Sequence, residues 1–124
     1  VDDEVASAKG EEGMAELAEA LEKAVGEQKA ATMWFMQNAM QNPNHLGAGA
    51  HHYMHIMGIA CLMLMWVKMA RVAKAKLAEG SDDKAFYEAK IATARVIWER
   101  AAARGEVSPD AVRDAVHEAG YQLA

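Results

Sequence analysis

The sequence has little of what most small folds outside the all-α class depend on. Its 124 residues include one cysteine, Cys61, two prolines and only 6% aromatic residues. A single cysteine excludes an intrachain disulfide and fits a reducing compartment, so we expect a cytoplasmic location. Alternating runs of β-branched residues are scarce, which argues against a β-sandwich. The acidic start of the chain lacks the basic-then-apolar pattern of a signal peptide.

The chain also lacks an excess of positive charge. It has 13 lysines and arginines against 18 aspartates and glutamates, a formal net charge of -5. Binding to DNA or RNA relies on clustered basic residues that neutralise phosphates, so we expect no nucleic-acid partner. The most apolar run, residues 53–67, is shorter than the roughly 20 residues that a membrane-spanning helix needs. We therefore expect no membrane contact.

Helical periodicity is what the sequence does have. Apolar residues at steps of three and four predict one helix over residues 11–40 and another over residues 48–77. Asn42-Pro43-Asn44 separates them, because proline cannot continue a helix and restricts the residue before it. The run over residues 53–67 is apolar on every side, which predicts a helix buried on all sides. Residues 1–10 are small and acidic and read as a flexible terminus.

Two further helices follow in the second half of the chain. Ser81, Asp82 and Asp83 are good capping residues before a helix predicted over residues 83–104. Its predicted core-facing stripe is Phe86, Ala89, Thr93, Val96, Ile97 and Ala101. Ser108-Pro109-Asp110 then predicts a short helix that ends near Ala119. With short connections, the expected fold is an all-α, up-down four-helix bundle with a short fourth helix, forming one domain over residues 11–124.

Several motifs in this order resemble a known family. They are Ala31-Thr32-Met33-Trp34, Asn42-Pro43-Asn44, Gly47-Ala48-Gly49-Ala50, Tyr53-Met54-His55, Met65-Trp66 and the stretch FYEAKIATAR over residues 86–95. Together they make residues 21–70 and 85–100 similar to the C-terminal helical extension of members of the acyl-CoA dehydrogenase family.

The resemblance implies a bundle that follows a flavin-binding dehydrogenase core acting on acyl-CoA. It implies a packing or subunit-contact role, with the core or a second copy of the chain as the partner. It implies no catalytic residue and no cofactor in this chain, since the catalytic carboxylate and the flavin site belong to the core.

An alternative of another class starts from the histidines. His51 and His55 are four residues apart and share a helix face, a spacing that suits two metal ligands. His55, between Met54 and Ile56, could also be the axial ligand of a haem. The alternative is thus an engineered or designed bundle that binds haem or a divalent metal through a histidine of the second long helix.

The other interpretation gives the histidines, the cysteine and the methionines a purely structural role. His51 and His52 are then exposed near a helix start, and His55 is hydrogen-bonded inside the bundle. Cys61 is then a small core residue, because free cysteine is often buried. The nine methionines are then a soft, adaptable core.

Overall fold

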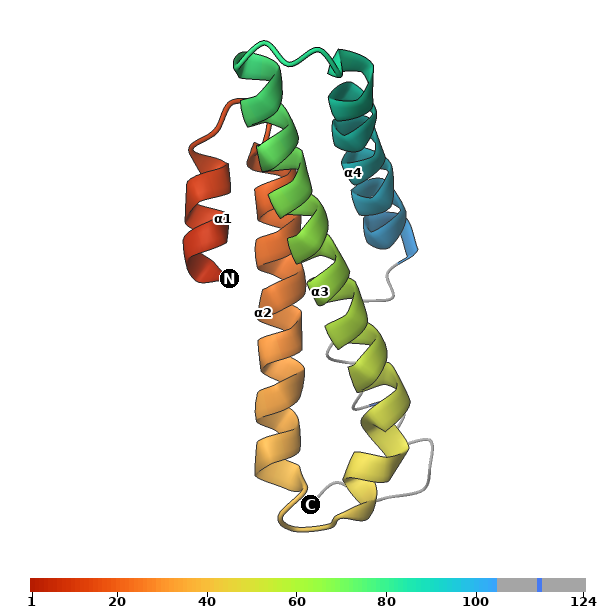
Figure 1. Cartoon of the computed structure of the whole chain (residues 1–124). Helices are drawn as coiled ribbons and strands as arrows, with labels where there is room; N and C mark the ends of the chain where they lie inside the picture. The colour runs from red at the N-terminus through yellow and green to blue at the C-terminus, as the bar shows by residue number, and fades with distance from the viewer. Residues whose placement is uncertain (105–113, 115–124) are drawn as a thin grey trace.

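The computed structural model of the chain describes residues 1–104 and Asp114. Every regular element within this part is an α-helix: α1 (Asp2–Lys9), α2 (Ala15–Asn38), α3 (Asn44–Ala78) and α4 (Lys84–Arg104). In Figure 1, α2, α3 and α4 run alternately up and down, and the short α1 lies beside α2. The all-α class is confirmed. The short helix expected after Pro109 lies outside the described residues.

The N-terminal residues differ from the expectation of a flexible terminus, because they form α1. Val5 and Ala8, three residues apart, share one face of this helix and are buried in the main core cluster. Asp2, Asp3 and Glu4 occupy the first turn, where negative charge interacts favourably with the helix dipole. These two small apolar residues are enough to pack one face of α1 against α2.

The main core lies where α2, α3 and α4 meet. Its buried members on α2 follow the predicted stripe, with Leu17, Leu21 and Ala24 four and three residues apart. They pack against Met63, Val67 and Ala70 of α3 and Ala94 of α4 in one continuous cluster. Helix α2 begins four residues later than predicted, at Ala15, because Gly13 adopts a φ of 74° and turns the chain between α1 and α2.

A second, smaller core joins α2 to α3 near the turn that connects them. Ala31, Phe35 and Ile56 are buried there, and the ring of Tyr53 meets Phe35 edge-on with 5.1 Å between centroids. The hydroxyl groups of Tyr53 and Thr32 are 2.9 Å apart and share a hydrogen bond. This contact fixes the register of the two long helices.

The turns lie close to where the sequence placed them. Helix α2 ends at Asn38 and α3 begins at Asn44, so Pro43 lies at the start of α3, where its missing N–H costs no hydrogen bond. At the other end, Gly80 adopts a φ of 80°, and the N–H of Ser81 donates to the carbonyl of Lys76. Glycine permits this left-handed closure of a helix.

The predicted stripe of the third long helix is wrong. Phe86, Ala89, Thr93 and Val96 are exposed on α4, and Ile97 is half-buried; Ala101 lies among residues whose side chains are not described. The residues that pack on the core are instead Ile91, Ala94 and Trp98. Two apolar stripes run along α4. The stripe that packs against α3 has the small Ala94 between the large side chains of Ile91 and Trp98, and a small residue at this position lets the two helices approach closely.

The sequence predicts a helix buried on all sides over residues 53–67, and this prediction is also wrong for α3. By length and composition it is the one described helix that could cross a membrane, with an 18-residue window of mean hydropathy 1.7 of which 33% is buried. A central helix of a helical bundle meets the same criteria, so this finding is weak evidence for a membrane. Because α1, α2 and α4 cover only part of its circumference, one face of α3 remains open.

A candidate interaction surface

A row of large apolar side chains is exposed along α3. We call it the α3 face, and its members, with their exposed fractions, are Met54 (62%), Leu62 (50%), Met65 (48%), Met69 (38%) and Val72 (59%). Steps of eight, three, four and three residues place them on one side of the helix. In Figure 1, α3 lies in front of α2 with α1 on one side and α4 on the other. The exposed fractions of the five side chains show that the other described helices leave them uncovered.

Three members of the α3 face, Met54, Leu62 and Met65, lie in a stretch of the chain without formal charge. From Ala30 to Val67 the sequence contains no lysine, arginine, aspartate or glutamate. This stretch comprises the last nine residues of α2, the turn and the first two-thirds of α3. Charged residues, which normally dominate exposed helix surfaces, are therefore replaced by methionine, histidine, amide and small side chains.

The methionines lie mostly on the surface. Six of the nine are exposed, and only Met14 and Met63 are buried, so a methionine-rich core is wrong. Met33, Met36 and Met40 form a second exposed group at the end of α2, with Met40 89% exposed. Methionine is flexible and polarisable, and it is used heavily at adaptable binding surfaces.

The histidines of α3 divide between the surface and the core. His51 and His52 are exposed, as predicted, but His55 is exposed as well and does not lie inside the bundle. His45, in the first turn of α3, is the buried one, and its ring lies over Trp34 with 6.1 Å between centroids. Periodicity could not identify it, because it precedes the apolar run at a helix start.

His51 and His55 do share a face. Their rings are nearly parallel, with 15° between planes and 6.5 Å between centroids. Within residues 1–104 and Asp114, however, no group of three or more histidine, cysteine, aspartate or glutamate side chains could hold a metal. A structural zinc site needs four ligands, and the described residues do not supply such a group.

Cys61 is exposed, so the expectation of a core cysteine is wrong. It lines a cleft of about 390 Å³ together with Val25, Met57, Ala60 and Leu64. This cleft lies between α2 and α3, at the first residues of α1. Its lining is largely aliphatic, and Asp2, Gln28 and Lys29 are its polar members.

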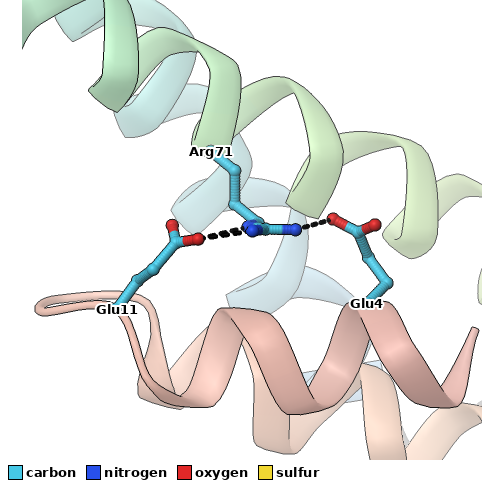
Figure 2. Close-up of polar contacts among 3 residues, drawn as sticks. All are labelled: Glu4, Glu11 and Arg71. Carbon is cyan, nitrogen blue, oxygen red and sulfur yellow. Dashed lines mark hydrogen bonds and ion pairs between the residues drawn. The ribbon is translucent and has the colours of Figure 1, made fainter.

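The basic residues near the end of α3 differ in their exposure. Lys68 and Lys76 are exposed, whereas Arg71 is half-buried and binds two carboxylates. Its Nε donates to Oε1 of Glu11 at 2.7 Å, and its Nη1 donates to Oε1 of Glu4 (Figure 2). These hydrogen bonds hold the pKa of the Arg71 guanidinium above its ordinary value, against the smaller, opposite effect of desolvation.

The α3 face was visible in the sequence as an excess of apolar residues. A helix that is apolar all round can be fully buried, or it can meet partners from outside the chain. Only three described helices contact α3, and the length of α3, about 50 Å for 35 residues, exceeds that of each of them. The predicted helices over residues 11–40 and 48–77 are equally long, so comparing predicted lengths could not show that some of the face would stay open.

Comparison with known proteins agrees with the fold. A search of curated proteins gave no match. The pattern of the family described as acetyl-CoA dehydrogenase C-terminal like matches residues 1–117, a longer range than the motifs alone indicated. The match includes α1 and extends beyond α4. The chain therefore belongs to the family of acetyl-CoA dehydrogenase C-terminal-like domains.

Proposed function

We propose that the chain is a non-catalytic packing domain that binds the flavin-binding core of an acyl-CoA dehydrogenase through the α3 face. The observation that carries this proposal is the row of five exposed apolar residues on one side of α3. Contiguous exposed apolar surface of this kind is typical of interaction sites in soluble proteins. Membership of the family supplies the partner, since its members are described as C-terminal parts of dehydrogenases.

The polar groups of the described clefts support a structural role. In the cleft of about 730 Å³ between α1 and α3, Arg71 binds both Glu4 and Glu11, which engages these two carboxylates in a contact between helices. A general acid or base needs a group that is positioned to exchange a proton with a substrate. Carboxylates held by an arginine instead serve to hold α1 on α3.

The energetics of the α3 face fit a domain contact. Complete burial of one such side chain contributes about 1.5–3 kcal/mol, so covering the half-exposed row contributes roughly 4–7 kcal/mol. Bringing two bodies together costs a similar amount in lost freedom. Firm binding therefore requires that further surface be covered too, and the exposed methionines at the end of α2, Met33, Met36 and Met40, offer additional apolar surface.

Sedimentation velocity tests the proposal. The chain is mixed with an FAD-loaded acyl-CoA dehydrogenase core that lacks such a domain, and co-migration is followed by flavin absorbance. Met65→Lys should abolish co-migration by placing a charge in the middle of the face. Val96→Lys is the matched control. Val96 is similarly exposed at 45%, but it lies on α4, on the side of that helix opposite the buried Ala94.

Three other results would count against the proposal. Equal loss of co-migration in both variants would mean that the α3 face is not the specific surface. Unchanged co-migration in Met65→Lys would exclude the face. Self-association of the wild-type chain that Met65→Lys abolishes, without co-migration with the core, would assign the face to a second copy.

A further inference from the structure

Helix α1 is the shortest of the four described helices. It has eight residues, and only Val5 and Ala8 are buried. A helix of this length is marginal in water by itself, because nucleation is unfavourable and few hydrogen bonds follow. Its helical state therefore depends on what holds it to α2 and α3.

Ion pairs make up much of that attachment. Asp2 pairs with Lys29 at 2.9 Å and Lys9 pairs with Glu22 at 2.7 Å, both on α2. These four side chains are 40–80% exposed, and exposed pairs contribute little because water and salt screen them. Lys29 lowers the pKa of the Asp2 carboxyl by a hydrogen bond and by charge attraction.

Arg71 differs from the other partners of α1. Its side chain is only 26% exposed, and it binds Glu4 of α1 and Glu11 of the following turn at once (Figure 2). One guanidinium on α3 thus holds both the helix and the turn that leads out of it. Partly buried, charge-assisted hydrogen bonds are stronger than exposed ones, so Arg71 is the main ionic attachment.

Clefts border α1 on both sides and at its first residues. One of about 730 Å³ lies between α1 and α3, beside Glu4 and Arg71, and one of about 410 Å³ lies between α1 and α2, beside Val5 and Val25. The third, beside Val1, is the aliphatic cleft of Val25, Met57, Ala60 and Leu64. Helix α1 is therefore seated along a narrow line of contact rather than surrounded by close packing.

We propose that α1 is a detachable cover, held by Arg71, over an apolar groove between α2 and α3. It opens as a unit about residues 10–13, where Gly13 has a positive φ of 74°. Opening extends the existing cleft of Val25, Met57, Ala60 and Leu64 along the two long helices. Local opening of a segment with few buried contacts needs no unfolding of the core.

Hydrogen exchange of the whole chain, read by mass spectrometry, tests this. In Arg71→Met, amides of α1 should exchange at least tenfold faster than in the wild type, while amides of α2, α3 and α4 stay within twofold. Salt at 1 M should accelerate α1 in the wild type and have less effect in Arg71→Met. Lys76→Met is the matched control, because Lys76 pairs only with Glu79 at the far end of α3 among the contacts described.

A milder variant and a second readout keep the test decisive. Glu4→Gln removes one carboxylate and leaves the Arg71–Glu11 pair, so it should accelerate α1 by a smaller factor. Fluorescence of an apolar dye should rise in Arg71→Met but not in Lys76→Met. The proposal is overturned if α1 and α2 accelerate together, if neither variant changes α1, or if α1 opens without an increase in dye binding.

Discussion

Glu27 is one of the few side chains whose titration responds to burial on folding. Desolvation raises the pKa of its carboxyl, and the charge of Lys23, 3.9 Å away, only partly offsets this. A carboxyl with a raised folded pKa stabilises the fold when protonated, below its unfolded pKa, and loses that contribution as the pH rises through the folded value. At pH 7 the ionised Glu27 therefore destabilises the fold.

Glu27→Gln should then raise the melting temperature at pH 7 by an amount equivalent to at most about 0.5 kcal/mol. At pH 3 the two proteins should melt alike, because the wild-type carboxyl is protonated. Thermal unfolding by circular dichroism measures both. Glu19→Gln, at an exposed position on the same helix, is the control; a lower melting temperature for Glu27→Gln at pH 7 would show that its pair with Lys23 outweighs burial.

Two glycines at the start of α3 give a second prediction on the same scale. Gly49 is buried, whereas a side chain at Gly47 would meet nothing within 4 Å. Gly49→Leu should therefore lower the free energy of unfolding by about 1–3 kcal/mol through overpacking. Gly47→Leu should leave it nearly unchanged, and urea unfolding compares them. Equal effects would mean that helix propensity, not space, determines the outcome.

The contact between α2 and α3 at Tyr53 allows one interaction between two helices to be measured. Tyr53→Phe removes the hydroxyl that shares a hydrogen bond with Thr32 and leaves the ring against Phe35. We expect a loss of about 1 kcal/mol in the free energy of unfolding, typical of one hydrogen bond. Tyr87→Phe removes the corresponding hydroxyl from α4 and should lower the free energy of unfolding by less. If the two variants lose the same amount, the hydrogen bond between Tyr53 and Thr32 adds no specific stability.

At the scale of elements, periodicity predicted the three long helices and their turns closely. It did so because Pro43 and Gly80 act locally, and because Leu17, Leu21 and Ala24 form the one clear stripe of α2. Local rules could not choose between the two stripes of α4, since the choice depends on how Ala94 fits against α3. They also could not show that α3 would lack a neighbour on one side.

In the candidate interaction surface, too, local features could be predicted from the sequence and contacts between distant residues could not. The apolar excess of α3 is plain from the sequence, but apolar periodicity alone predicts a core position, which is why His55 and Cys61 are expected inside the bundle. Periodicity could not pair Arg71 with Glu4 and Glu11, because they lie some sixty residues earlier in the chain. Contacts over such separations are set by the packing of whole helices.

For the whole molecule, we expect the isolated chain to be folded and free of flavin. Far-UV circular dichroism should show a strongly helical spectrum with a cooperative thermal transition. Absorbance above 400 nm should be absent after purification and after dialysis against FAD. A yellow protein would contradict the assignment of the flavin site to a separate core.

Addition of hemin or zinc tests the remaining histidine hypothesis. Since the described residues supply only a pair of neighbouring imidazoles, we expect no binding below about 10 μM, which corresponds to roughly -7 kcal/mol. A Soret shift that His55→Ala abolishes and His52→Ala preserves would instead establish His55 as a ligand. Both variants should keep their helical spectrum, because both side chains are exposed.

The charge-free stretch from Ala30 to Val67 has a kinetic consequence. Charges on a binding surface speed association by orienting partners before contact, and a surface without them gives no such guidance. Docking through this stretch should therefore proceed at about 10⁵–10⁶ M⁻¹s⁻¹, the range for unsteered encounters. Stopped-flow rates at 20 mM and 500 mM salt should agree within a factor of about two, so the lifetime of the complex, rather than the speed of encounter, would determine how long this domain stays bound.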